Sequence, residues 1–115
     1  MTDADFRLMP VLRIAHAVSQ GVSLHEALTR AGYATHRARF GPEDLRAVLV
    51  NHPALVDEWL AYSEDKRTDG GWYVLRDGEI GQVLKPTSQR TYAPIQEAIA
   101  QFIIRELDSH LGPPP

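Results

Sequence analysis

The sequence predicts an α+β fold: a bundle of four to five short helices, then a β-hairpin or three-strand antiparallel meander, and a C-terminal amphipathic helix. Changes in the spacing of apolar residues support this prediction. Apolar positions recur at helical spacing as far as about residue 67, alternate from Trp72 onward, and return to helical spacing after Pro94. Helices and strands that occupy separate parts of one chain are typical of the α+β class.

Prolines, glycines and capping residues mark the helices of the first half. A first helix is expected over residues 10–20, with proline in its first turn and Gly21 after its end. The motif Ser-Leu-His-Glu at residues 23–26 has the spacing of a capping box and predicts a second helix that ends at Gly32. A short helical turn is expected over residues 35–40.

Two longer helices are expected to begin at prolines. Pro42 follows a glycine and precedes two acidic residues, which are favoured at the positive end of a helix dipole. Pro53 ends that helix and begins the next one. This second helix is expected to fray through residues 64–67 before Gly70 and Gly71 break it.

Residues 72–92 are predicted to form the sheet. Residues 72–76 are rich in strand formers, the pair Asp77-Gly78 is a hairpin signal, and residues 80–85 read as the return strand. A turn at residues 86–88 and a short third strand at 89–92 follow. Because a lone hairpin is marginally stable in water, we expect the helix that starts at Pro94 to cover one sheet face.

The length of the chain, 115 residues, corresponds to one domain, expected over residues 1–111 with a disordered proline-rich tail at 112–115. The absence of cysteine excludes disulfides and suits a reducing cytoplasm. No apolar run has the length of a membrane span and the acidic N-terminus does not resemble a signal peptide. We therefore expect a cytoplasmic protein without a membrane partner.

Charge is distributed unevenly along the chain. The net charge of −3 argues against broad nucleic-acid binding. Residues 1–42 carry five basic and three acidic side chains, whereas residues 43–83 carry four basic and nine acidic ones. An acidic block of this kind can steer a basic partner toward the surface that carries it.

A stretch of aromatic and charged residues within this acidic block predicts a protein-binding surface. Four of the nine aromatic residues lie between positions 59 and 73, with charged residues between them. Rings that fill pockets and charges that set register are typical of specific interfaces. Trp72 is assigned to the core, because it shares a strand face with Val74. The predicted partner-binding residues are Trp59, Tyr62, Glu64, Asp65, Lys66, Arg67, Asp69 and Tyr73.

The same run, followed by a hairpin and an amphipathic helix, resembles a segment of small bacterial proteins of toxin–immunity type. The resemblance implies a non-enzymatic inhibitor that binds one cognate toxin, and an acidic, aromatic surface would suit a basic toxin domain such as a nuclease. No specific immunity family is assigned, so no toxin-contacting residue is transferred from it.

An alternative hypothesis is a small helix-turn-helix regulator. The capped helix before Gly32 is followed by a basic second element, and the nucleic-acid contacts would come from Arg30, His36, Arg37 and Arg39. The early break at residues 41–42 and the acidic chain count against it. A third hypothesis is self-association through the apolar face of the last helix.

No motif predicts catalysis, a metal site or a cofactor. The five histidines show no His-x-x-x-His pair and no cysteine is present to complete a metal site. Ser63 lacks a nucleophile motif. The neighbouring acids Asp57-Glu58 and Glu64-Asp65 diverge by about 100° on a helix and so do not converge on one substrate atom. The sequence therefore predicts a binding protein that is not an enzyme.

Overall fold

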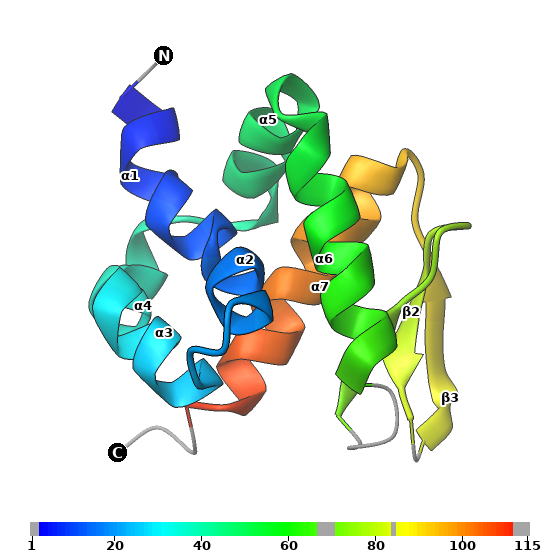
Figure 1. The fold of residues 1–115 in the computed structure, drawn as a ribbon. Coiled ribbons are helices and arrows are strands. Elements are labelled where there is room, and N and C mark those ends of the chain that lie inside the picture. The colour runs from blue at the N-terminus through cyan, green and yellow to red at the C-terminus, as the bar shows by residue number, and fades with distance from the viewer. Residues whose placement is uncertain (1–2, 67–70, 84, 112–115) are drawn as a thin grey trace.

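The computed structural model of the protein describes residues 3–66, 71–83 and 85–111, so the predicted tail at 112–115 lies outside the described residues. The fold is α+β, with the C-terminal helix that the sequence predicts (Figure 1). The helices are α1 (Asp3–Leu12), α2 (Ile14–Ser19), α3 (Leu24–Ala31), α4 (Tyr33–His36), a 3₁₀ turn η1 (Arg37–Arg39), α5 (Pro42–Asn51), α6 (Pro53–Lys66) and α7 (Ile95–Ser109). The strands are β1 (Trp72–Val74), β2 (Glu79–Gln82) and β3 (Lys85–Thr91).

The sheet is an antiparallel meander with the strand order β1-β2-β3. Its first hairpin pairs Tyr73 with Gly81 and Val74 with Ile80. Gly78 stands in the turn with φ +96°, a backbone conformation that glycine adopts without a steric penalty. The three-strand form of the sequence prediction is therefore confirmed.

Helix α7 lies at the centre of the molecule. Eight of its residues are buried, and it packs against α5, α6 and the first two strands. In Figure 1, α6 and α7 lie between the sheet on one side and α1–α4 on the other. The apolar face of α7 is thus used within the fold and is not free for the self-association considered from the sequence.

The outer edge of β1 is closed by side chains of two helices. The buried Ser63 of α6 accepts a hydrogen bond from the Val74 N–H (2.8 Å) and donates one to the Val74 carbonyl (3.0 Å). The carboxylate of Glu106 on α7, which is 0% exposed, accepts from the Trp72 N–H at 3.3 Å. These two buried polar residues supply partners for backbone groups that an edge strand leaves unpaired.

Several predicted boundaries are wrong. The helix expected over residues 10–20 is divided between α1 and α2, and the return strand expected over residues 80–85 ends at Gln82. The first helix begins at Asp3, before Pro10, because the buried stripe of Leu8, Val11 and Leu12 already runs at helical spacing there. The third strand begins at Lys85, so the predicted turn at 86–88 lies inside it. The Ser88 hydroxyl accepts from the Gln82 N–H and donates to the Lys85 carbonyl, both at 2.7 Å, beside a register shift between β2 and β3.

Among the described residues, no helix combines the length and the apolar composition that crossing a membrane requires.

Candidate functional site: an acidic groove between α2 and α6

Two helix faces of small and acidic residues meet where α2 packs beside α6. Helix α2 contributes Ala15, Val18 and Ser19, and helix α6 contributes residues 58, 61, 62 and 65. Both sets follow the i, i+3, i+4 spacing that places side chains on one helix face. Small side chains do not fill the space between the two helices, and a groove of about 340 Å³ remains. We call it the α2–α6 groove; its lining residues are Ala15, Val18, Ser19, Glu58, Ala61, Tyr62 and Asp65.

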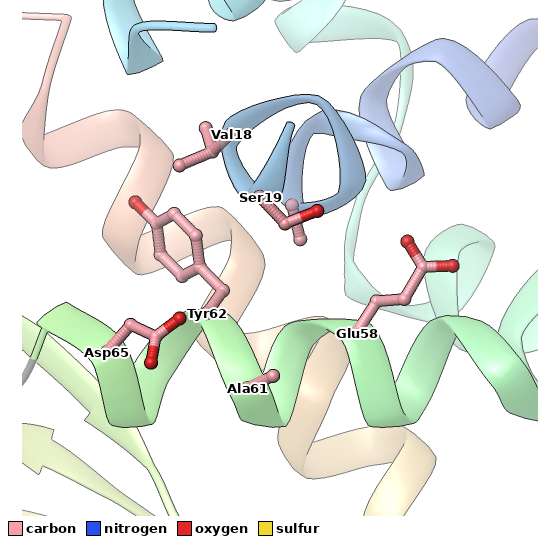
Figure 2. A pocket seen from close by; sticks show the side chains of 7 residues that line it. Val18, Ser19, Glu58, Ala61, Tyr62 and Asp65 are labelled. Atoms are coloured by element: carbon pink, nitrogen blue, oxygen red, sulfur yellow. The ribbon is translucent and has the colours of Figure 1, made fainter. Parts of the chain in front are cut away.

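The α2–α6 groove is acidic along its α6 side and apolar in the middle. Figure 2 shows Glu58 and Asp65 on either side of Tyr62 along α6, with Val18 and Ser19 of α2 across from them. The charged residues that line the groove, among those the structure describes, are both carboxylates. Its volume is at the small end of the range of ligand-binding pockets, so it fits a single side chain or a small molecule.

Glu58 carries an oxygen that lacks a hydrogen-bond donor. Its side chain is 32% exposed as a whole, but Oε2 is buried and no described residue donates a hydrogen bond to it. The His16 Nδ1 lies 3.4 Å from this oxygen, in a geometry that makes no hydrogen bond. A carboxylate with one buried oxygen that lacks a hydrogen bond is unfavourable, so a cation that enters the groove and meets the exposed part of this carboxylate would be stabilised there.

Tyr62 forms the fixed wall between the two carboxylates. Its hydroxyl donates to Glu106 Oε2 at 2.8 Å, and its ring packs edge-on against Trp59 and Phe102. Burial raises the pKa of the Tyr62 hydroxyl far above its usual value, and the charge of Glu106 and their hydrogen bond raise it further. Tyr62 is therefore a neutral donor to α7 and keeps its ring in place beside the groove.

The geometry of the groove suits the binding of a cation better than nucleophilic catalysis. The Ser19 hydroxyl donates to the backbone carbonyl of His16 at 2.6 Å, so it is not paired with an imidazole nitrogen that would activate it. Within the part of the chain that the structure describes, no group of three or more His, Asp or Glu side chains is arranged to hold a metal ion.

The structure separates the predicted partner-binding residues. Trp59 is 0% exposed and its Nε1–H donates to the Leu12 carbonyl at 2.9 Å, so it belongs to the core and is not an accessible anchor. Tyr62 is 8% exposed and reaches the surface only as a wall of the α2–α6 groove. Tyr73 is half-buried on β1, where its hydroxyl donates to Glu79 at 2.7 Å.

The charged members of the predicted surface lie at the C-terminal end of α6 and beyond it. Glu64 and Asp65 are exposed, and Asp65 alone of the two lines the groove. Lys66 is the last residue of α6, but its side chain lies outside the described residues, as do Arg67 and Asp69. The predicted surface is therefore narrowed to the groove and the exposed acids of α6.

The core assignment of β1 is correct for Val74, which is 3% exposed. Trp72 on the same strand face is half-buried and packs against the core, with the guanidinium of Arg105 5.3 Å from its ring centroid.

The basic residues of the helix-turn-helix hypothesis do not form a recognition helix in the described residues. The second element consists of the four-residue α4 and the turn η1. Arg30 pairs with Glu26 on its own helix at 2.8 Å. Arg37 pairs with Asp108 of α7 at 2.8 Å and donates to the Phe40 carbonyl. His36 and Arg39 remain exposed.

Sequence reasoning identified Tyr62 and Asp65, but it missed the other residues that line the groove. The α2 side has no chemical signature, because Ala15, Val18 and Ser19 are typical of any short helix. A usable signal was present on α6: Glu58 and Asp65 are seven residues apart and therefore share a helix face with Tyr62. Acidic residues that are adjacent in the sequence diverge on a helix, whereas acidic residues at this longer spacing lie on one helix face.

Comparisons with protein-family models, with curated proteins and with solved structures found no match to this chain. The resemblance of the segment at residues 59–73 to toxin–immunity proteins therefore stays a prediction.

Proposed function

We propose that the protein is a non-enzymatic binding module that holds a lysine or arginine side chain of a partner protein in the α2–α6 groove. The observation that carries this proposal is the partly exposed carboxylate of Glu58, whose Oε2 has no hydrogen bond among the described residues, in a groove whose described charged lining residues are both acidic.

The groove matches both parts of a long basic side chain. The apolar stretch of Ala15, Val18 and Ala61 suits the aliphatic stem, which such residues bury along apolar surface. The carboxylates of Glu58 and Asp65 suit the charged head, since hydrogen bonds between ionised groups are about twice as strong as neutral ones. The fixed ring of Tyr62 limits how far the head can move between them.

In its most concrete form, the proposal is an immunity or inhibitor protein for a bacterial toxin with a basic surface, acting in the cytoplasm. Helix α6 carries four acidic side chains over two turns, at positions 57, 58, 64 and 65, which would steer a basic domain toward the groove. The helix-turn-helix alternative has less support, because Arg30 and Arg37 are occupied by carboxylates within the fold.

Two double variants of α6 test the proposal. Glu58→Gln/Asp65→Asn removes both groove carboxylates, and Asp57→Asn/Glu64→Gln removes the same charge from exposed positions outside the groove. A partner is first captured from a nuclease-treated native lysate with the tagged wild-type protein and then purified. Association and dissociation rates are measured for each variant over roughly 0.05–0.5 M salt, a range in which exposed charges become screened.

We expect the groove variant to lose affinity by about 2 kcal/mol or more, roughly 30-fold, mainly through faster dissociation. The variant outside the groove should only slow association a few-fold at low salt, since its charges contribute to steering. Equal losses in the two variants would mean that the general charge of α6 binds the partner, and the groove would be rejected. If no protein partner is captured after nuclease treatment, and nucleic acid is recovered from an untreated lysate, the proposed function itself is rejected.

A further inference from the structure

A second pocket, of opposite charge, lies between α1 and the segment that links α4 to α5. It has a volume of about 280 Å³ and is lined by Arg7, Leu8, Pro10, His36, Arg39 and Phe40. We call it the basic pocket. Its floor includes the buried side chains of Leu8 and Phe40, and its rim carries three exposed basic residues. None of the described residues that line it is acidic.

The floor of the basic pocket is held rigidly. Arg37 donates to the Phe40 carbonyl at 3.0 Å, and its guanidinium lies 5.5 Å from the centroid of the Phe40 ring. Arg37 is itself fixed by Asp108 of α7, and the Phe40 ring packs edge-on against the buried Tyr33. The sequence suggested Arg37 as a nucleic-acid contact. In the structure, Arg37 instead holds Phe40, which forms part of the pocket floor.

The rim residues of the basic pocket have no counter-charge among the side chains that the structure describes. Among those side chains, which on α1 begin at residue 7, no hydrogen bond or ion pair is found for Arg7, His36 or Arg39. Other arginines are paired: Arg37 with Asp108 and Arg76 with Asp57 are examples. The two exposed guanidinium groups of Arg7 and Arg39 beside a concave apolar floor form an arrangement that an oxyanion would stabilise.

From this arrangement we infer that the basic pocket binds a small organic anion, in which a carboxylate or phosphate group is attached to a compact apolar body. The guanidinium groups of Arg7 and Arg39 take the oxyanion, which matches their planar donor geometry. The apolar body rests on Leu8 and Phe40, which supply most of the buried floor. The ring of His36, which packs against the backbone of Gly32, closes one side.

This inference is independent of the proposed function. It uses residues that do not line the α2–α6 groove and a ligand of the opposite charge. Failure of one leaves the other intact.

The test uses phenyl phosphate and benzoate as probes. Two comparison compounds each carry one part of the proposed ligand: inorganic phosphate has the oxyanion without the apolar body, and benzyl alcohol has the apolar body without the anionic group. Amide chemical shifts of the full chain are followed by nuclear magnetic resonance during titration, and calorimetry gives the dissociation constants. We expect saturable shifts at Leu8, His36, Arg39 and Phe40 with phenyl phosphate or benzoate. Inorganic phosphate should bind at the same residues at least tenfold more weakly, and benzyl alcohol should not saturate. The stronger of the two aryl anions identifies phosphate or carboxylate as the preferred head group.

Matched arginine variants separate the pocket from general surface charge. Arg7→Ala/Arg39→Ala should weaken the aryl anion at least about tenfold, since each guanidinium supplies a charge-assisted hydrogen bond. Arg13→Ala/Arg90→Ala removes the same charge from exposed positions outside the pocket and should change affinity less than twofold. All four positions are exposed, so both variants are expected to fold, which the thermal transition verifies.

Three results would overturn the inference. One is the absence of saturable shifts at the pocket residues with either aryl anion. Another is an equal loss of affinity in the two arginine variants. The third is a duplex oligonucleotide that binds with steep salt dependence and shifts Arg13 and Arg30 as strongly as Arg39, while the small probes do not bind. That outcome would assign the basic residues to a nucleic-acid backbone.

Discussion

Replacing Ser63 by alanine tests how the groove helix is attached to the sheet. The Ser63 hydroxyl is the hydrogen-bond partner of both the N–H and the carbonyl of Val74, on the edge of β1 that faces away from β2. Alanine removes both partners without changing the backbone of α6. Val74 is 3% exposed, so water does not reach these groups easily. The substitution therefore leaves two buried backbone groups unpaired at once.

The cost follows from the number of groups left unpaired. Each buried donor or acceptor without a partner costs about 1–3 kcal/mol, so the loss of both partners in Ser63→Ala should lower the free energy of unfolding by about 2–6 kcal/mol. Unfolding entropy near 2.1 cal/mol/K per residue gives roughly 0.24 kcal/mol/K for a chain of this length. The melting temperature should therefore fall by about 8–25 °C.

Urea denaturation and calorimetry measure this change, and hydrogen exchange locates it. The Val74 amide should exchange faster than the global loss of stability alone explains. Ser19→Ala is the matched control, because the Ser19 hydroxyl is exposed and bonds a carbonyl one turn away in its own helix; we expect a change below about 0.5 kcal/mol. A Ser63→Ala protein as stable as the control, with an unchanged Val74 amide, would refute the role given to Ser63.

Two further predictions concern the hairpin turn and the buried tyrosines. Gly78 and Gly21 have nearly the same φ, +96° and +97°, but a Cβ at Gly78 would clash with the Tyr92 carbonyl, whereas a Cβ at Gly21 meets no atom within 4 Å. Gly21→Ala should therefore cost only the backbone strain of about 1–2 kcal/mol, and Gly78→Ala clearly more, when both are measured by urea denaturation; equal costs would contradict the close approach. Burial raises the pKa of Tyr33 and Tyr62 in the folded protein above the value near 10 of the unfolded chain. Stability should hold below pH 10 and fall above it by about 1.4 kcal/mol per pH unit for each tyrosine. Tyr62→Phe should reduce that slope by the contribution of one tyrosine. An unchanged slope in denaturation curves from about pH 9 to 11 would contradict the link between the raised pKa of Tyr62 and the loss of stability.

The helix ends that local chemistry determines could be predicted from the sequence. Ser23 accepts from the Glu26 N–H as a capping residue, Gly32 adopts the left-handed conformation that ends α3, and Pro42 begins α5. Each of these signals acts within four residues of chain, so no knowledge of the tertiary structure is needed. The start of α1 differs from the prediction. Pro10 predicts the beginning of a helix, but it stands in the last turn of α1.

The role of the aromatic residues in the acidic block could not be predicted in the same way. Trp59 and Tyr62 have the composition of an interface, but their polar atoms bond to Leu12 and to Glu106, which lie 47 and 44 residues away. Those partners become neighbours only after α6 has packed between α2 and α7. The composition therefore predicts a helix rich in aromatic side chains that carry a polar group. Tertiary packing determines that these side chains face the core.

Charge order along the chain carried more information about binding than composition did. Residues 1–42 are net basic and 43–83 net acidic, and the two pockets preserve this division. One wall of each comes from the N-terminal helices: α1 contributes Arg7 to the basic pocket, and α2 contributes Ala15 to the α2–α6 groove. The opposite walls come from segments some 30 and 40 residues further on, namely Arg39 and Glu58. The charges of the two proposed ligands thus follow from the charge order of the sequence, whereas the concave shape of each pocket depends on two distant segments meeting, which only the fold determines.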